Sequence, residues 1–370
     1  MPAADRLPDF PWDTLAAAAE RARAHPDGIC DLSVGTPVDP VPEIGQAALR
    51  AAADSPGYPQ VWGSEALRQA ILAYLSHRWG VVGLSQQGVC PVVGAKEAIA
   101  WLPTLLGLGP GDQVVIPAVA YPTYAVGALM AGAEPVPADR PDQVARLRPG
   151  LVWVNWPSNP TGAVADAESV RAWVEYARQR GAVLASDECY GEFGWTAEPV
   201  SALDPAVAGG DLSGLVGLFS LSKRSNLAGY RAGFMAGDPA VVQPLVALRK
   251  HLGLMVAAPV QAAMVALLGD QDHVERQRRR YAARRDRLQA ALGQAGFQIE
   301  RSEAGLYLWA SQGRTGRATV EALAELGLLV APGDFYGPAG ADYVRIALTA
   351  TDERIEAAAR RIEAAWPAAG

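Results

Sequence analysis

Short apolar runs alternate with longer helical segments from Val89 onward, and this alternation restricts the fold of the chain more than any other feature. Each run is apolar throughout, which predicts strands buried on both faces of a mostly parallel sheet with helices on either side. The seven predicted strands are Val89–Val93, Gln113–Pro117, Glu134–Pro137, Leu151–Asn155, Ala182–Ser186, Leu215–Leu221 and Ala232–Ala236. The helices predicted between them are Ala95–Leu106, Thr123–Ala131 and Ala167–Arg180. Ligands bind beyond the carboxyl ends of strands in such sheets, so we expect a site there.

The segments on either side of this region predict a second, smaller α+β domain. A proline-rich arm leads into predicted elements at Trp12–Ala24, from Asp31, at Pro42–Ala53 and from the capping Ser64 to Trp79. Beyond the sheet region we predict helices at Pro239–Leu268, Asp270–Gly293, Arg317–Leu326 and Asp352–Ala365, with strands at Gly305–Ala310, Leu328–Ala331 and Tyr343–Leu348. The charges from Glu275 to Asp286 indicate a solvated helix face. We therefore expect residues 1–40 to form an arm and part of the small domain, residues 41–269 the large domain, and residues 270–370 the small C-terminal domain.

Charge and cysteine content exclude several classes of protein. A formal net charge of −7 argues against nucleic acid or an anionic membrane as a partner. Cys30, Cys90 and Cys189 are widely spaced and odd in number, which argues against a disulfide framework or a metal site. The N-terminus lacks the basic and then apolar pattern of a signal peptide, and no apolar run approaches the length of a membrane span. We expect a cytoplasmic protein.

One lysine follows a predicted buried strand and enters a loop lined with hydroxyl groups. The chain has three lysines, Lys96, Lys223 and Lys250, among 32 basic residues, so a retained lysine suggests chemistry that arginine cannot perform. A desolvated lysine can lose its proton and form an imine with a carbonyl compound. Ser220, Ser222 and Arg231 supply donors suited to a phosphate group. Together they suggest pyridoxal phosphate held as a Schiff base on Lys223, against the alternative of a solvated surface lysine.

Two further turns lie at predicted strand ends. Gly94-Ala95-Lys96 opens a helix, and backbone N–H groups at a helix N-terminus bind phosphate well. Asn159 stands in an Asn-Pro-Thr-Gly turn and can direct its amide into a cleft toward the cofactor's ring hydroxyl. Taken alone, each of these motifs is equally compatible with an ordinary turn.

Acidic and aromatic side chains at other strand ends fit the cofactor ring. The carboxylate of Asp187 could pair with the pyridine nitrogen and keep it protonated, which makes the ring an electron sink. Glu188 alternates to the other side of an extended segment, so Asp187 is preferred for this role. Tyr190 can donate a hydrogen bond to the ring oxygen. Tyr121 could stack on the ring or simply pack in the core.

In order and spacing, these motifs resemble the fold-type I pyridoxal-phosphate aminotransferases of class I/II over essentially the whole chain. The resemblance rests on Asn159-Pro160-Thr161-Gly162, Asp187 with Tyr190, Ser220-x-Ser222-Lys223, Arg231 and Arg345. It implies that Lys223 carries the Schiff base and moves the proton, with Asp187 at the ring nitrogen, Asn159 and Tyr190 at the ring oxygen and Tyr121 stacked. It further implies that Gly94, Ala95, Lys96, Ser220, Ser222 and Arg231 hold the phosphate, with Tyr58 reaching over from a second subunit of a homodimer. Arg345 and the backbone of Gly35 would contact the substrate. Ala95 departs from the Ser or Thr frequent in the family.

Within that family, the segments Leu32–Pro42 and Ser222–Arg231 are most similar to the actinobacterial N-succinyldiaminopimelate aminotransferases of lysine biosynthesis. This implies a ping-pong reaction between glutamate and the 6-oxo precursor of N-succinyl-L,L-diaminopimelate. Its distal carboxylates need a cation, for which Arg224 is the candidate; the alternative is that Arg224 braces its loop.

Other activities stay open. On the same fold these are a broad, aromatic or aspartate-specific aminotransferase and a carbon–sulfur β-lyase. A regulator that uses the fold as an effector sensor is a further alternative.

Overall fold

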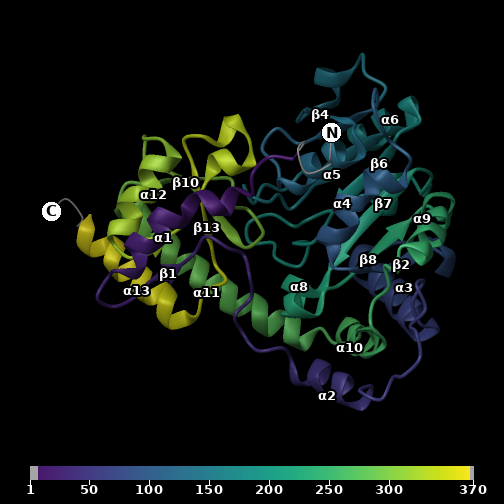
Figure 1. Cartoon of the computed structure of the whole chain (residues 1–370), viewed down its shortest axis with the longest axis horizontal. Helices are drawn as coiled ribbons and strands as arrows, with labels where there is room; N and C mark the ends of the chain where they lie inside the picture. The colour runs from purple at the N-terminus through teal and green to yellow at the C-terminus, as the bar shows by residue number, and fades with distance from the viewer. Residues whose placement is uncertain (1–6, 367–370) are drawn as a thin grey trace.

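A computed structural model describes residues 7–366, so residues 1–6 of the predicted arm and 367–370 of the predicted C-terminal domain lie outside the described residues. Two units lie side by side, one built on a seven-stranded sheet and the other on a four-stranded sheet (Figure 1). Within the described residues, no helix is both long enough and apolar enough to cross a membrane.

The larger sheet confirms the predicted architecture. In spatial order its strands are β2 (Val89–Val93), β8 (Ala232–Gly237), β7 (Leu215–Ser220), β6 (Val183–Asp187), β5 (Leu151–Asn155), β3 (Gln113–Ile116) and β4 (Glu134–Pro137). Of these seven strands β8 alone runs antiparallel to both of its neighbours, and the pairs from β7 to β4 are all parallel. The carboxyl ends of β5, β6 and β7 therefore meet at one edge of the sheet, where Asn155 pairs with Asp187.

Helices cover both faces of this sheet, which explains why its central strands are mostly apolar. One face packs against α4 (Ala95–Leu105), α5 (Thr123–Ala131) and α9 (Pro239–His251). The other face packs against α3 (Glu65–Trp79), α6 (Ala167–Arg180) and α10 (Ala258–Leu268). On β5, Leu151 and Trp153 enter the first of these cores, while Val152 and Val154 enter the second. Smaller elements are α2 (Glu43–Ala51), α7 (Pro205–Ala208) and α8 (Leu221–Arg224).

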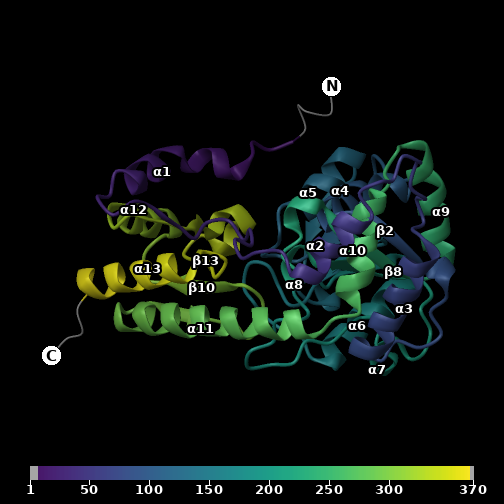
Figure 2. The same cartoon turned by 90° about the horizontal axis from the view of Figure 1, so that it is seen from below.

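The smaller unit combines the C-terminal third of the chain with the N-terminal arm. Its antiparallel sheet has the order β12 (Ala331–Pro332), β13 (Val344–Ala347), β10 (Tyr307–Ser311) and β9 (Gln298–Glu300). Its helices are α11 (Asp272–Gln294), α12 (Gly316–Glu325), α13 (Asp352–Ala365) and, from the arm, α1 (Ala16–Arg23). The arm strand β1 (Cys30–Asp31) pairs in parallel with β11 (Leu328–Leu329). Figure 2 shows α11 running along this unit beside α13, with α1 against α12.

The structure corrects one prediction about helices. The single helix predicted from Pro239 to Leu268 is two helices, α9 and α10, separated by residues 252–257. Pro259 lies in the first turn of α10, where it removes no hydrogen bond, whereas inside one unbroken helix it would remove one. The charged residues of α11 from Glu275 to Asp286 are mostly exposed or half-buried, as predicted, with Arg284 as the exception. Arg284 is buried and forms a two-pronged ion pair with Asp39 of the arm.

A second buried ion pair holds α4, the helix that begins at the cavity edge of the large sheet. Arg249 of α9 is fully buried and donates to both carboxylate oxygens of Glu97 on α4, at 2.7 and 2.9 Å. Glu97 Oε2 also accepts the backbone N–H of Val93. The pair therefore joins α9, α4 and the end of β2.

We expect Arg249→Met to lower the free energy of unfolding by about 3–5 kcal/mol, because it leaves the Glu97 charge without a partner in a largely buried position. Lys250→Met on the exposed side of the same helix is the control and should change stability little. Urea unfolding of both variants measures the difference, and equal effects of the two would contradict the prediction. Adding Glu97→Gln to Arg249→Met should recover part of the loss.

Candidate active site

A cavity of about 660 Å³ lies at the carboxyl ends of the large sheet and is closed on its other side by β10, β13 and the arm. Twelve of the predicted site residues line it: Gly35, Ala95, Lys96, Tyr121, Asn159, Asp187, Tyr190, Ser220, Ser222, Lys223, Arg231 and Arg345. Gly94 lies directly behind Arg231. Of the remaining predicted residues, Tyr58 and Arg224 do not line the cavity.

Lys223 enters the cavity from the one-turn helix α8. Ser220 caps this turn, and its side chain accepts a hydrogen bond from the backbone N–H of Ser222 at 3.1 Å. The ammonium group donates to the backbone carbonyl of Gly35. Burial lowers the pKa of Lys223, and the nearby charges of Arg345 and Arg231 lower it further. A neutral amine, the form that attacks an aldehyde, is therefore more accessible here than in water.

Backbone and cationic groups converge at the N-terminus of α4. Gly94 has φ +74°, and a Cβ atom there would lie 2.2 Å from Nη2 of Arg231, so glycine allows the guanidinium to rest on the backbone. Lys96 follows one residue into the helix, and burial together with the charge of Arg231 lowers its pKa. In the described part of the chain, Asp187 is the one residue of the cavity lining that carries a carboxylate. The arrangement suits a phosphate dianion.

Asp187 ends β6 with its carboxylate in the cavity. The hydroxyl of Tyr124 donates to Oδ2 at 2.7 Å, and the backbone N–H of Cys189 donates to Oδ1 at 3.1 Å. Burial raises the pKa of Asp187, although both bonds oppose that effect. Glu188 is directed away and accepts the backbone N–H of Ala202 at 2.9 Å. The structure therefore presents Asp187 rather than Glu188 to a ligand in the cavity.

Arg345 and Asn159 meet on the wall formed by the smaller unit. Arg345 is 3% exposed; its Nη1 donates to Oδ1 of Asn159 and its Nη2 to the carbonyl of Ser33, both at 2.8 Å. Its Nε is buried and has no hydrogen-bond partner among residues 7–366. Asn159 is in turn fixed by a 2.8 Å bond from its backbone N–H to Oδ1 of Asn155. A fixed guanidinium with an unsatisfied donor can receive a carboxylate.

Sequence reasoning missed several aromatic side chains of the site. Tyr307 lies in the cavity wall, and its hydroxyl is 2.8 Å from that of Tyr190. Phe10 and Trp12 of the arm also line the cavity. Alternation along β10 places Tyr307 beside Arg345, so pairing the predicted strands Gly305–Ala310 and Tyr343–Leu348 could have found it. The aromatic pair in a proline-rich arm was a weaker signal.

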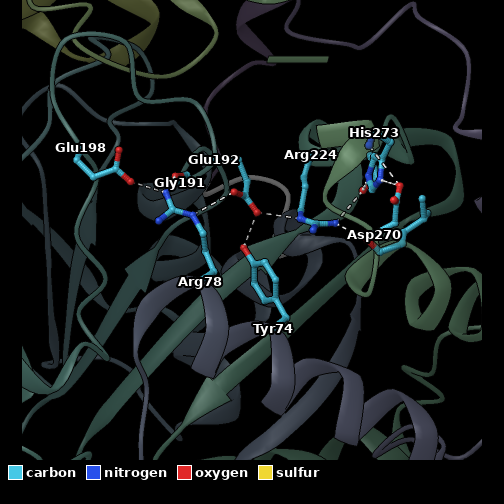
Figure 3. A network of polar contacts seen from close by, with 10 residues as sticks. Tyr74, Arg78, Gly191, Glu192, Glu198, Arg224, Asp270 and His273 are labelled. Carbon is cyan, nitrogen blue, oxygen red and sulfur yellow. Dashed lines mark hydrogen bonds and ion pairs between the residues drawn. The ribbon is translucent and has the colours of Figure 1, made fainter. Parts of the chain in front are cut away.

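The structure corrects the prediction that Arg224 reaches along the cleft. Arg224 is 3% exposed; its Nε donates to Glu192 at 2.9 Å and its Nη1 to the carbonyl of Leu267 at 2.7 Å. Figure 3 shows Glu192 between Arg224 and Arg78, with the hydroxyl of Tyr74 also donating to it. Lysine and arginine neighbours in a one-turn helix point to different sides, which explains the result. Arg224 braces the loop that carries Lys223.

Tyr58 is 97% exposed on the surface of this chain, away from the cavity lining. Its predicted contact with the phosphate site of a second subunit stays a prediction.

The charges of the cavity fit pyridoxal phosphate. Among residues 7–366, Lys96, Lys223, Arg231 and Arg345 line it with a single carboxylate, that of Asp187. Such an excess of positive charge in a cavity favours an anionic ligand. A phosphate at the N-terminus of α4, an aldehyde at Lys223 and a pyridine nitrogen at Asp187 match the groups present.

These features define an enzyme of the fold-type I, pyridoxal-phosphate-dependent class. Residues 27–362 match the family model described as aminotransferase class I and II. The chain belongs to this family, and its cofactor is pyridoxal 5'-phosphate.

Similar proteins cover nearly the whole chain. The probable aminotransferase Rv1178 of Mycobacterium tuberculosis is 57% identical over 96% of this chain and 85% of its own length. The 4-dedimethylamino-4-oxo-anhydrotetracycline transaminase OxyQ of Streptomyces rimosus is 55% identical, over 96% of this chain and 99% of its own. The solved structure of a probable N-succinyldiaminopimelate aminotransferase from Thermus thermophilus is 30% identical, with a TM-score of 0.85, over 96% of this chain and 100% of that one. The chain is therefore a transaminase that acts on amino and oxo compounds.

We expect borohydride reduction of the holoenzyme to leave the cofactor covalently attached to the peptide that contains Lys223. Lys223→Arg should lose the label completely, because a guanidinium keeps the charge but does not form the imine. Lys96→Arg, in the same cavity, is the control and should keep it. Peptide mass spectrometry reads the result, and a label retained in Lys223→Arg would remove this lysine from the role.

Because Arg224 braces its loop, Arg224→Met should lower the free energy of unfolding by about 1.5–3 kcal/mol through the loss of charge-assisted hydrogen bonds. Values of kcat/KM for small and large acceptors should fall by the same factor. Glu192→Gln, which removes the other charge of the pair, should give the same pattern. A loss confined to acceptors with distal carboxylates would instead restore a role in substrate binding.

Proposed function

We propose that this aminotransferase transfers an amino group from a glutamate-like donor to a large oxo acceptor whose α-carboxylate is bound by Arg345. The observation that carries the proposal is the buried guanidinium of Arg345 in the cavity wall, fixed by two neutral oxygens and with Nε unsatisfied within the described part of the chain. A carboxylate supplies the missing acceptors and the missing charge.

The residues of the chain divide the work as follows. The N-terminus of α4, Lys96, Arg231 and the hydroxyl groups of Ser220 and Ser222 hold the phosphate. When bound, the cofactor supplies an aldehyde that condenses with amines and a ring that accepts electrons. With the cofactor bound, Asp187 would keep the ring nitrogen protonated, Asn159 and Tyr190 would bind the ring oxygen, and Tyr121 would lie against the ring. Lys223, whose pKa burial lowers, takes the proton from the substrate Cα and returns it.

The first candidate acceptor is the 6-oxo precursor of N-succinyl-L,L-diaminopimelate. Its support is the likeness of the segments around Gly35 and Lys223 to that subgroup and the similarity to the Thermus thermophilus structure. Its distal carboxylates need a cation, and the four that line the cavity in this subunit have other assignments. We therefore propose that the enzyme is a homodimer and that the partner subunit completes the site, with Tyr58 at the subunit boundary.

A second candidate is an aromatic or polycyclic oxo acceptor. The observation that favours it is the aromatic lining that the arm adds to the cavity through Phe10 and Trp12. OxyQ, at 55% identity, is named for a polycyclic substrate. Flat apolar rings bury surface against such walls without needing a second cation.

A single-turnover panel separates these candidates. The amino form of the holoenzyme is mixed with N-succinyl-2-amino-6-oxopimelate, with an aromatic 2-oxo acid or with 2-oxoglutarate, and the absorbance of the cofactor is followed. The second-order rate constant for the best acceptor should exceed those for the others by at least about tenfold, which is the effect of one good charge-assisted hydrogen bond. Cystathionine incubated without an oxo acid tests the β-lyase alternative, which predicts pyruvate release. Absence of turnover with every acceptor would contradict the proposed function.

Arg345→Lys should lower kcat/KM for α-amino acids by roughly 10- to 100-fold, because an ammonium keeps the charge but cannot form the two-pronged bond. A primary amine without a carboxylate is the control substrate and should react equally slowly with the variant and the parent. Equal losses with both substrates would show that Arg345 supports the fold rather than the carboxylate.

A further inference from the structure

Tyr307 lies on a mostly apolar strand, yet both its ring and its hydroxyl contact polar groups of the cavity. It is buried on β10, whose register pairs Tyr307 with Ala347 and Trp309 with Arg345 of β13. Residues two apart on a strand face the same side, so Tyr307 and Arg345 are diagonal neighbours on the face turned to the cavity. Both line the cavity.

The ring of Tyr307 lies against the charge of Arg345. The guanidinium carbon lies 4.0 Å from the ring centroid of Tyr307, against 5.0 Å for Tyr336 and 5.8 Å for Trp12. A cation over an aromatic face within about 6 Å is stabilised by the ring quadrupole, and more so when it is desolvated. Arg345 has no carboxylate partner within residues 7–366, so this ring contact and two neutral oxygens hold it.

The hydroxyl of Tyr307 contacts a second functional group. It lies 2.8 Å from the hydroxyl of Tyr190, and either could be the donor. Burial opposes ionisation of Tyr307, but the charges of Arg345 and Lys223 and the bond with Tyr190 outweigh it and lower the pKa of Tyr307. Burial and Tyr307 raise the pKa of Tyr190. A hydrogen bond in which Tyr307 donates to Tyr190 would leave the proton of Tyr190 free for the cavity.

Gly35 explains how this hydroxyl keeps its place. A Cβ atom at Gly35 would lie 2.0 Å from the Tyr307 hydroxyl oxygen, so any other residue there would displace it. The carbonyl of the same glycine accepts the ammonium of Lys223. Because Gly35 has no side chain, the Tyr307 hydroxyl can lie against its backbone, near Lys223, while the ring contacts Arg345.

We propose that Tyr307 is a positioning residue for two groups at once: its ring holds the guanidinium of Arg345, and its hydroxyl directs that of Tyr190 toward the ring oxygen of the cofactor. The inference rests on the proposed function for the roles of those two residues. It assigns Tyr307 no proton transfer to the substrate.

The test separates the hydroxyl from the ring. Tyr307→Phe removes only the hydroxyl, and Tyr307→Leu also removes the ring. Tyr336→Phe is the matched control, since the Tyr336 hydroxyl has no hydrogen-bond partner in the described part of the chain although its ring also faces Arg345. Each holoenzyme is titrated with pH in the absence of substrate, and the absorbance of the bound cofactor gives the midpoint of its proton loss. Glutarate, a dicarboxylate without an amino group, then probes Arg345 through the same absorbance.

In Tyr307→Phe we expect the midpoint to rise by about 0.4–1 pH unit, the effect of about one hydrogen bond. A weaker bond from Tyr190 leaves the ring oxygen more basic, so the proton it shares with the Lys223 nitrogen is held to higher pH. Glutarate affinity should stay within about twofold, because the ring remains under Arg345. Tyr307→Leu should show the same rise and also lose about three- to tenfold in glutarate affinity. Tyr336→Phe should match the parent in the titration.

Two results would overturn the inference: a parental midpoint in Tyr307→Phe, or an equal shift in Tyr336→Phe. If Tyr307→Leu does not fold, the comparison of the two phenylalanine variants still decides the hydroxyl role. The titration needs only bound cofactor and no turnover. Failure of the proposed substrate assignment therefore leaves it readable.

Discussion

An excess of positive charge within one cavity is the constraint on which the rest of this structure depends. Four cationic side chains share one cavity with the carboxylate of Asp187. Burial lowers the pKa values of Lys96 and Lys223, and the neighbouring charge of Arg231 lowers both further. The fold holds three of the four cations through hydrogen bonds to neutral oxygens: Ala228 for Arg231, Gly35 for Lys223, and Ser33 with Asn159 for Arg345. These oxygens carry no charge, so the positive charge is left for the ligand.

Buried arginines outside the cavity follow the opposite rule. Each has a carboxylate partner: Glu192 for Arg224, Glu97 for Arg249 and Asp39 for Arg284. These pairs join segments distant in sequence, and because each arginine charge is neutralised by a carboxylate, none is available to a ligand. The type of counter-group, charged or neutral, therefore distinguishes arginines that support the fold from those that bind. Sequence alone shows an arginine in both cases, which is why Arg224 was expected in the cleft.

The sequence predicts the fold well because its dominant signal is local. Continuous apolar runs between helices determine a sheet covered on both faces, and the site residues at strand ends follow from that topology. The roles of Tyr307 and Tyr124 were not predicted, because they arise from contacts between residues distant in sequence: Tyr307 with Tyr190, and Tyr124 with Asp187. The break between α9 and α10 was missed for a different reason: apolar periodicity continued through residues 252–257 and outweighed the proline signal. The resemblance to a known family supplied individual roles that no pattern of spacing contained.

Because β1 pairs with β11, the N-terminal arm cannot complete its backbone pairing until the C-terminal third of the chain has been synthesised. Cys30 and Asp31 leave the ribosome early, but their backbone partners at Leu328 and Leu329 are among the last to emerge. The apolar residues of α1 likewise share a core with residues of α12 and α13, so they stay without a partner until translation is nearly complete. Because Phe10 and Gly35 flank this strand and line the cavity, the catalytic pocket is the last part of the molecule to be assembled. A chain that stops before β11 has no backbone partner for β1 and leaves this side of the cavity unfinished.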